Sequence, residues 1–261
     1  MKISVVTVSY NSEKTIRDTL ESVYNQTHDE IEYLIIDGKS TDKTIEIVKE
    51  YESKFENTNT DFRWISEKDN GIYDAINKGI MLATGDVVGI LNSDDFYADR
   101  SVLADITETF NEKECECLYA NLKYIDPNTE KVTRDWKSKP FKKGLFEKSW
   151  TPAHPTFYCK KSIYDKYGLY RTDFKIAADV ELMYRFLEKN NVSSYYLDRY
   201  LVTMRQGGVS SSGIKSTIII TKEMIKAFKD NGNHLNIVKY LFYKGLKYKE
   251  FIIKSGDYNE N

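Results

Sequence analysis

The feature that most constrains the fold is an alternation of two patterns along residues 1–110. β-Branched runs without a helical period, which are typical of buried strands, alternate with segments whose apolar residues recur at helical spacing. Strands that alternate with helices imply a parallel sheet covered by helices on both faces. We predict strands at 3–8, 31–36, 62–65 and 87–91, and helices at 16–24, after Ser40-Thr41-Asp42, and at 72–82.

The pattern changes in the second half of the chain. A β-hairpin is predicted between Cys117 and Trp136, with its turn at Asp126-Pro127-Asn128. A helix is predicted at 177–188 and a further strand at 194–203, and the remainder reads as mainly helical.

The charge of the chain excludes one class of partner. Its 38 basic and 40 acidic residues nearly balance, which argues against a nucleic-acid-binding protein. The balance is uneven, because residues 214–261 contain nine Lys against five acidic residues. We therefore predict a main domain at 1–213, with halves at 1–110 and 111–213, and a basic amphipathic helical extension at 214–261.

We expect a cytoplasmic protein. The segment Met1 to Ser9 is too short and too rich in hydroxyl groups for a secretory signal. No run approaches the ~18 apolar residues of a membrane span. The three cysteines are too few for a disulfide framework.

Carboxylates gather where the predicted strands end. Asp37 follows the second strand, Asp69 the third, and Asp94 and Asp95 the fourth. Ligands of such sheets bind beyond the carboxyl ends of the strands, and clustered carboxylates need a positive charge among them. A divalent cation, Mn²⁺ or Mg²⁺, bound at Asp94-Asp95 is one interpretation. The other is that this acidic pair caps a helix that begins near Arg100.

Three later features have a functional and a structural interpretation each. Asp179, near the start of the predicted helix, is either a base or a helix cap. His154, held between apolar and proline residues in Pro152-Ala-His-Pro155, is either a ligand contact or an ordinary surface histidine. The glycine- and serine-rich loop 207–213 either cradles an anion with its N–H groups or is a plain linker.

Two common nucleotide-binding motifs are missing. No Gly-x-Gly-x-x-Gly follows the first strand, which argues against a dinucleotide site of the usual kind. Gly38-Lys39-Ser40 imitates the end of a P-loop, but Tyr33 stands where that motif needs its first glycine.

A series of motifs, in this order along the chain, closely resembles family 2 glycosyltransferases of the bacterial polysaccharide and lipopolysaccharide type. The resemblance covers about residues 1–213. The matching motifs are Thr7-Val-Ser-Tyr-Asn11, Gln26-Thr27, Ile36-Asp-Gly-Lys-Ser-Thr-Asp-Lys-Thr44, Glu67-Lys-Asp-Asn-Gly-Ile-Tyr-Asp-Ala-Ile-Asn-Lys-Gly79, Ala83-Thr-Gly-Asp86, Leu91-Asn-Ser-Asp-Asp95 and Ala178-Asp-Val-Glu-Leu182.

The resemblance implies a fold and an activity. The fold is α/β of the GT-A type, a Rossmann-like mixed sheet flanked by helices, with a nucleotide-sugar-binding half at 1–110 and an acceptor-binding half at 111–213. The activity is inverting transfer of a sugar from a nucleotide-sugar donor, a UDP-sugar first, to a hydroxyl group. The acceptor is a glycan or a lipid-linked glycan in cell-surface polysaccharide biosynthesis.

The resemblance also assigns roles to single residues. Asp94 binds a divalent metal that bridges the two donor phosphates, Asp95 supports it, Asp179 is the catalytic base and His154 orients the acceptor. Arg205 and the loop 207–212 supply donors to the phosphates. The predicted nucleotide contacts are Thr7, Ser9, Tyr10, Asn11, Asp37, Asp69, Asn77 and Asn92.

The chain departs from the family pattern at two positions. Asn92 replaces the first Asp of the family's Asp-x-Asp metal motif, which removes one charge from the metal site. Gly38 replaces the second Asp of the commoner Asp-Asp-Gly-Ser motif, so Asp37 alone supplies that carboxylate.

The end of the chain has two interpretations. Residues 235–253 interleave aromatic and aliphatic residues with Lys, as in helices that lie on anionic membranes. Such a helix would bring the protein to the inner face of the cytoplasmic membrane. The alternative is a helix packed on the catalytic body or on a second copy of the chain.

Two other functions compete with the transferase. A sugar-1-phosphate nucleotidyltransferase generally has a glycine-rich loop with a basic residue after the first strand, and Tyr10-Asn11-Ser12-Glu13 is not one. A catalytically silent nucleotide-sugar-binding scaffold is the second rival, and the intact Asp94, Asp95 and Asp179 count against it.

Overall fold

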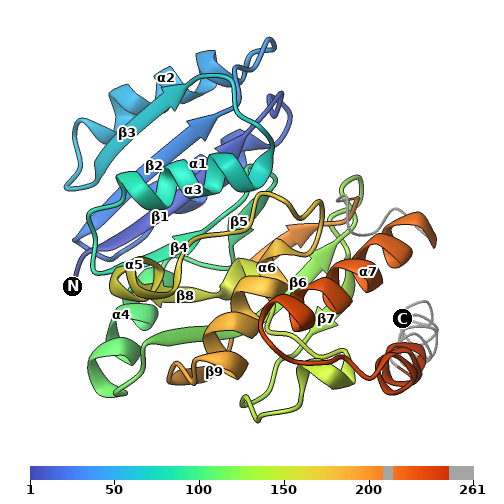
Figure 1. The fold of residues 1–261 in the computed structure, drawn as a ribbon. Coiled ribbons are helices and arrows are strands. Elements are labelled where there is room, and N and C mark those ends of the chain that lie inside the picture. The colour runs from blue at the N-terminus through green and yellow to red at the C-terminus, as the bar shows by residue number, and fades with distance from the viewer. Residues whose placement is uncertain (208–213, 247–261) are drawn as a thin grey trace.

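The four strands predicted in the first half lie side by side and are parallel (Figure 1). The computed structural model describes residues 1–207 and 214–246. The strands run in the order β3-β2-β1-β4, and three helices alternate with them along the chain. The elements are β1 (Ile3–Ser9), α1 (Ile16–Tyr24), β2 (Ile31–Asp37), α2 (Thr44–Phe55), β3 (Asp61–Ser66), α3 (Ile72–Leu82) and β4 (Val87–Ile90).

Both faces of this part of the sheet are buried, as the apolar runs predict. Val6 and Val8 of β1 pack in one hydrophobic cluster with helix α3, whereas Ile3 and Val5 pack in a second cluster with helices α1 and α2. Successive side chains of a strand point to opposite faces, so a strand covered on both sides must be apolar throughout. The predicted parallel sheet with helices on both faces is confirmed for these strands.

The remaining strands make the sheet mixed. β8 inserts between β4 and β6 and is antiparallel to both, whereas β9 is parallel to β6 and pairs with β5 at the sheet edge. The predicted hairpin is present as β6 and β7. The elements are β5 (Asp95–Tyr97), α4 (Val102–Glu112), β6 (Cys117–Ile125), β7 (Val132–Trp136), β8 (Tyr158–Lys160), α5 (Lys161–Tyr167), α6 (Ala178–Met183), a π-helical turn (Tyr184–Lys189), β9 (Ser194–Arg205), α7 (Ile214–Asp230), and two 3₁₀ turns, η1 (Phe146–Lys148) and η2 (His154–Thr156).

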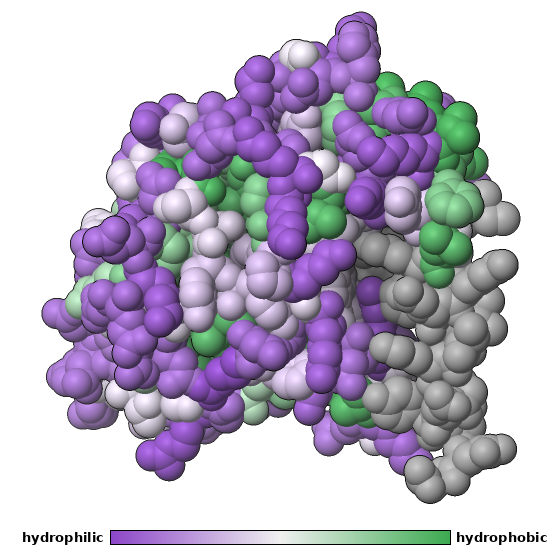
Figure 2. All heavy atoms as spheres, turned by 90° about the horizontal axis from the view of Figure 1, so that it is seen from below, coloured by the Kyte–Doolittle hydropathy of each residue, from purple (hydrophilic) through white to green (hydrophobic). Residues whose placement is uncertain are grey.

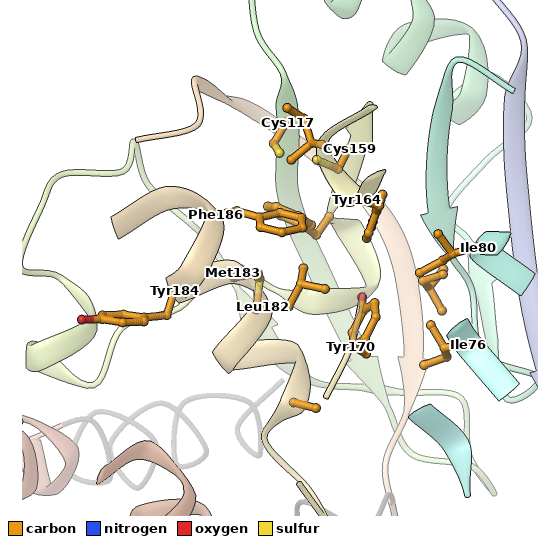
Figure 3. Packing of buried hydrophobic residues seen from close by; sticks show 14 of the residues in the cluster. Ile76, Ile80, Cys117, Cys159, Tyr164, Tyr170, Leu182, Met183, Tyr184 and Phe186 are labelled. Atoms are coloured by element: carbon orange, nitrogen blue, oxygen red, sulfur yellow. The ribbon is translucent and has the colours of Figure 1, made fainter. Parts of the chain in front are cut away.

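Helix α7 is packed into the larger hydrophobic cluster and lies beside α6 (Figure 1). Met224, Ala227 and Phe228 are buried in it, and the Phe228 ring lies 4.3 Å from that of Tyr184, centroid to centroid. Figure 3 shows Phe186, Leu182 and Tyr164 of this cluster near one another, with Tyr184 farther to the left. The proposed boundary after Gly213 therefore precedes a helix that shares the core of the main domain.

Glu32 joins several groups at the amino ends of the parallel strands. This edge of the sheet lies opposite the edge where the carboxylates cluster. Glu32 is fully buried in β2, accepts hydrogen bonds from Ser4 Oγ at 2.5 Å and from Thr84 N and Oγ1 at 2.8 and 2.6 Å, and pairs with Arg63. Although burial by itself opposes ionisation, these hydrogen bonds and the nearby Lys2 lower the pKa of Glu32 from 4.5 to about 2.

Apolar side chains are exposed near the end of the described chain. Residues 237–246 are helical, and Val238, Leu241 and Phe242 keep 81, 47 and 62% of their surface exposed. Seen from below, the molecule is largely hydrophilic, with apolar side chains gathered on one edge (Figure 2). Within 1–207 and 214–246, no helix combines the length and the apolar character that crossing a bilayer requires. The tail residues from 247 onward lie outside the described residues.

Candidate active site

The carboxyl ends of the parallel strands meet at one edge of the sheet and bring the predicted polar residues together. Gly38 N donates to Ser9 O at 2.8 Å, and Glu67 N donates to Asp37 O at 3.0 Å. Ser12 and Ser93, which follow β1 and β4, share a hydrogen bond of 2.8 Å between their hydroxyl groups. Strand order reverses between β1 and β4, and such a switch point is where open α/β sheets bind ligands.

Asp37 is a structural hub within this edge. It is 1% exposed and accepts from Ser9 Oγ, Ser40 N, Ser40 Oγ and Ser66 Oγ at 2.5–3.0 Å. Both oxygens of the carboxylate are thereby occupied by groups from the ends of three strands. Asp37 fixes the backbone at this edge of the sheet, and its direct contact with a nucleotide stays a prediction.

Three other predicted nucleotide contacts are bonded within the protein itself. Thr7 is buried, with its hydroxyl 3.1 Å from that of Tyr33. Asn11 has a left-handed φ of 50° and accepts from Thr41 N at 2.9 Å, which joins the loops that follow β1 and β2. Asn77 is buried and pairs with the backbone N–H and C=O of Tyr170 at 2.9 and 2.8 Å. The direct contact of these residues with a nucleotide stays a prediction.

Tyr10 and Asp69 are the predicted residues that are turned toward the open side of this edge. The Tyr10 side chain is 65% exposed. A Cβ atom at Gly38 would lie 2.5 Å from Asp69 Oδ2 and 3.4 Å from the Tyr10 ring. The Asp69 carboxylate thus occupies the space into which a side chain at position 38 would extend. Where the family motif has an Asp at position 38, this chain has Gly38, and the Asp69 carboxylate from the loop after β3 lies beside that position.

Asp94 and Asp95 form a pair of carboxyl groups after β4, of which Asp94 is half-buried and Asp95 is buried. Asp95 is fully buried, its Oδ2 accepts from Asn92 Nδ2 at 3.2 Å, and its Oδ1 has no hydrogen-bond partner in the part of the chain that the structure describes. Burial raises the pKa of both groups, and the charge of Asp94 adds to the rise for Asp95. Asn92 contributes an amide donor to this pair.

The interpretation of this acidic pair as a helix cap is wrong. Asp95 begins strand β5, and α4 begins only at Val102. At the start of that helix, Asp99 Oδ1 accepts from Ser101 N at 2.9 Å, and Gln26 accepts from Leu103 N at 3.0 Å.

The pairing of β5 with β9 brings Arg205 to the carboxyl pair. Asp95 lies opposite Met204, and Arg205 Nη1 donates to Asp94 O at 2.9 Å. The same guanidinium pairs with Asp18 and lies 5.0 Å from the centre of the Phe96 ring. Arg205 is therefore beside the predicted metal ligands, already held by two partners. The loop after Arg205 is also predicted to bind the phosphates, and its residues 208–213 lie outside the described residues.

A divalent metal fits the chemistry of this pair. Two adjacent carboxylates, one with an unpartnered buried oxygen, are ligands that Mg²⁺ and Mn²⁺ prefer. Within the described ranges, no group of three His, Cys, Asp or Glu side chains is arranged to hold a metal. The protein therefore fits an ion that completes its coordination with phosphate oxygens and water.

His154 and Asp179 face the same site from the second half of the chain. Thr156 anchors the 3₁₀ turn that contains His154, because its hydroxyl bonds to both backbone groups of Ala120 in β6 at 3.0 and 3.1 Å. His154 Nδ1 lies 3.3 Å from Asp179 Oδ2. Burial has the largest effect on the pKa of Asp94 and raises it. The backbone of Asp94, Arg205 and, least of all, His154 lower it. His154 thus contacts Asp179 and lies within electrostatic range of Asp94.

Asp179 does not act as a cap for helix α6. Its Oδ1 is buried and has no hydrogen-bond partner among the described residues, although the side chain as a whole is 18% exposed. Burial raises the pKa of Asp179, against the opposing effect of His154. Glu223 of α7 instead holds the backbone that leads into the helix, by accepting from Lys175 N, Ile176 N and Ala177 N.

Two residues of this region were missed by sequence reasoning. Glu223 was missed because a Glu in a helix is usually solvated. The signal that could have found it is a charged residue within the apolar spacing of Ile220, Met224 and Ala227. Tyr73 lies inside a recognised motif, but its hydroxyl bond to Ile176 O at 2.5 Å spans 103 residues and leaves no local pattern.

Comparison with known sequences gives a family. A sequence profile of the family described as Glycosyl transferase family 2 matches residues 4–169. An uncharacterized glycosyltransferase of Mycobacterium tuberculosis (strain ATCC 25618 / H37Rv) is 32% identical over 187 residues, which cover 70% of this chain and 68% of the relative. A Methanococcus voltae protein, dolichyl N-acetyl-alpha-D-glucosaminyl phosphate 3-beta-D-2,3-diacetamido-2,3-dideoxy-beta-D-glucuronosyltransferase, is 30% identical over 221 residues, covering 74% of this chain and 66% of the relative.

Comparison with solved structures confirms the GT-A fold. The crystal structure of S. aureus TarS 1-349 in complex with UDP-GlcNAc has a TM-score of 0.66 and 22% identity, and the match covers 87% of this chain and 66% of TarS 1-349. The mannosyltransferase PcManGT from Pyrobaculum calidifontis, in complex with GDP-Man and Mn²⁺, has a TM-score of 0.64 and 17% identity, covering 93% and 68%. The fold, the profile match over more than half of the chain and the relative at 32% identity together show that this chain belongs to Glycosyl transferase family 2.

Proposed function

We propose that this protein is an inverting glycosyltransferase that moves a sugar from a nucleotide-sugar donor, a UDP-sugar first, to a hydroxyl group of a glycan or lipid-linked acceptor in cell-surface polysaccharide biosynthesis. One observation carries the proposal: Asp179 Oδ2 lies 3.3 Å from His154 Nδ1, its Oδ1 is buried and unpartnered among the described residues, and the same histidine acts electrostatically on Asp94. A displacement at the anomeric carbon needs a base on the acceptor side and a stabilised leaving group on the donor side.

The proposed donor pocket is the edge formed by Tyr10, Gly38 and Asp69. An exposed aromatic ring offers a stacking surface for a nucleobase. The adjacent Asp69 carboxylate accepts from Gly71 N at 2.9 Å and has a further oxygen that can accept an N–H from a base. A base that presents an N–H donor, such as uracil, suits this combination. The complex of TarS with UDP-GlcNAc supports UDP as the first donor to test.

The proposed mechanism is a single displacement. The acceptor hydroxyl loses its proton to Asp179, its oxygen bonds to the anomeric carbon, and the bond from that carbon to the diphosphate oxygen breaks. The configuration at the carbon inverts, and the nucleoside diphosphate leaves. The burial that raises the pKa of Asp179 makes it a stronger base than a solvated carboxylate. His154, 3.3 Å away, orients the carboxylate and the acceptor.

Asp94, supported by Asp95, would hold the divalent metal, which when bound supplies positive charge to the leaving diphosphate. Arg205, beside Asp94, adds a fixed positive charge on the same side. The complex of PcManGT with GDP-Man and Mn²⁺ supports Mn²⁺ as the first ion to test. Because the described part of this chain lacks three protein ligands at the site, we expect it to bind the ion together with the nucleotide diphosphate and weakly without it.

The first prediction concerns donor turnover. From a panel of UDP-, GDP- and dTDP-sugars, we expect slow release of nucleoside diphosphate from one donor, in a reaction that requires Mn²⁺ or Mg²⁺. Asp94→Ala should lower this rate by roughly 10²–10³-fold, as the loss of several kcal/mol of leaving-group stabilisation predicts. Asp29→Ala, at an exposed acid at the opposite edge of the sheet, is the matched control and should leave the rate unchanged.

Other outcomes of the panel would favour the rival functions. Nucleotide binding in calorimetry without turnover of any donor and acceptor pair would favour a silent scaffold. Consumption of a sugar 1-phosphate and a nucleoside triphosphate, with release of pyrophosphate, would favour a nucleotidyltransferase. Absence of any nucleotide binding would overturn the transferase proposal.

The second prediction concerns the exposed side chains of helical residues 237–246, where the sequence predicts membrane contact or self-association. Lys239 is engaged with Glu147 at 2.6 Å, so the exposed surface of this segment is more apolar than the sequence indicates. We expect the full chain to bind vesicles with anionic lipids and the double variant Leu241→Ser, Phe242→Ser to lose this binding. Equal sedimentation of both proteins with vesicles would remove the idea. A change in oligomeric state in light scattering, without vesicle binding, would favour self-association.

A further inference from the structure

The segment that leads into helix α6 is held between two helices. Residues 175–177 directly precede the helix that contains Asp179. On one side lies α3, whose Tyr73 hydroxyl donates to Ile176 O at 2.5 Å and accepts from Ala178 N at 3.3 Å. On the other side lies α7, from which Glu223 reaches the same segment.

Glu223 makes an unusually complete set of bonds. Its side chain accepts from Lys175 N at 2.6 Å, from Ala177 N at 2.8 Å and from Ile176 N at 3.1 Å. The residue is 9% exposed. Three backbone N–H groups on one buried carboxylate fix the path of the backbone, because charge-assisted hydrogen bonds are short and about twice as strong as neutral ones.

Asp179 is held mainly by the backbone around it. Its Oδ1 is unpartnered among the described residues, its Oδ2 lies 3.3 Å from His154 Nδ1, and against the larger effect of burial the backbone N–H groups of Asp179 and Val180 lower its pKa. The place of this carboxylate is therefore set by the backbone of residues 176–178, which Tyr73 and Glu223 hold from opposite sides.

We propose that Glu223 is a positioning residue that sets the place of the Asp179 carboxylate and thereby joins the C-terminal helix α7 to the active site; this rests on the proposed role of Asp179 as the base. The geometry excludes a merely peripheral role for Glu223, because its bonds end two residues before Asp179. Its negative charge also adds to the rise in the pKa of Asp179 that burial mainly causes. The partly exposed ion pair of Arg171, which lies before the segment, with Asp230 of α7 at 2.6 Å contributes less, because solvent screens it.

The test is Glu223→Gln. The variant keeps one acceptor oxygen but turns an amide group toward a backbone N–H, so at least one of the three bonds is lost. We expect kcat for metal-dependent release of UDP from the donor identified in the panel to fall by about 10–100-fold, as small misplacements of a reacting group do. KM for the donor should change by less than about twofold, since the donor pocket is built on β1–β4. Glu223→Asp, which retains the carboxylate, should recover part of the loss.

A matched variant separates positioning from stability. Phe228→Leu lies on the same helix, is buried and touches the core rather than residues 175–177. It should lower the thermal midpoint at least as much as Glu223→Gln while keeping kcat. Equal losses of kcat in the two variants at equal losses of stability would overturn the proposal.

A measurement without turnover distinguishes failure of this proposal from failure of the proposed function. The chain has three His, so the ring signals in a ¹H–¹³C spectrum are few, and His154→Gln assigns the one beside Asp179. This signal should shift in Glu223→Gln and in Tyr73→Phe, which removes the opposite support, but not in Phe228→Leu. An unmoved signal in both variants would overturn the proposal. A moved signal in a protein that turns over no donor would keep the positioning role and reject the function.

Discussion

Asp179→Asn is expected to lower the rate of sugar transfer by about 10²–10⁴-fold, the usual contribution of a general base. The amide has nearly the shape of the carboxylate but cannot accept the proton of the acceptor hydroxyl. Nucleotide binding should be unchanged, because the proposed donor pocket is at the ends of β1–β4. Rates of transfer and nucleotide affinity by calorimetry, compared with wild type, check both parts.

The same substitution should not weaken the fold. Burial raises the pKa of Asp179 above 3.8, so the stability that its protonated form contributes is present at low pH and is lost as pH rises through the raised pKa. Because Asn cannot ionise, the variant does not lose this stability as pH rises. The thermal midpoint of Asp179→Asn should therefore be at least as high as that of wild type at pH 8. The difference in favour of the variant should be larger at pH 8 than at pH 4.

Asp165→Asn, at an exposed acid of helix α5, is the control for loss of one negative charge. It should change neither transfer nor the thermal midpoint. Near wild-type transfer by Asp179→Asn would show that Asp179 is not the base.

Glu32→Gln is expected to lower the free energy of unfolding at pH 7 by roughly 2–4 kcal/mol, the second large effect. Glu32 is fully buried and joins Ser4, Thr84 and Arg63 at one edge of the sheet. An amide at this position keeps one acceptor and turns its NH₂ group toward donors. For a chain of this length we expect a fall in the thermal midpoint of about 4–16 °C, measurable by calorimetry.

The pH dependence of that loss follows from the lowered pKa. With a folded-state pKa of about 2 against an ordinary 4.5, the contribution of Glu32 is fully present above about pH 4.5 and is lost as pH falls toward 2. The difference between wild type and Glu32→Gln should shrink over that interval. Glu46→Gln, an exposed acid of α2, should match wild type throughout. A constant difference from pH 7 to pH 3 would contradict the account.

The first half of the fold could be predicted from sequence because its signals are local. Apolar strands and helices with one apolar stripe leave a pattern within ten residues, and the carboxyl ends of parallel strands must share an edge. That is why the amino-acid sequence alone predicts the grouping of Asp37, Asp69, Asp94 and Asp95 at one edge of the sheet.

Beyond the hairpin β6–β7 and the strand predicted at 194–203, the arrangement of the second half could not be predicted, because it depends on pairings between distant segments. β5 and β8 have three residues each, too few to show a period, yet β5 brings Asp95 opposite Met204 and so sets the place of Arg205. The same holds for Asp37, whose carboxylate is occupied by serines from β1, β3 and the loop after β2. Sequence indicates that such a residue is polar and well placed, but not which partners saturate it.

The position of Glu223 late in the chain has a consequence for the order in which the protein is made. The edge with Asp69 and Asp94 is built from residues 3–95, which leave the ribosome before α7 does. The backbone before Asp179 gains its partner only when α7, with Glu223 46 residues after Ala177, has also been synthesised. Because chains fold from the N-terminus as they are made, the edge proposed to bind the nucleotide can form before the part that would remove the proton is complete.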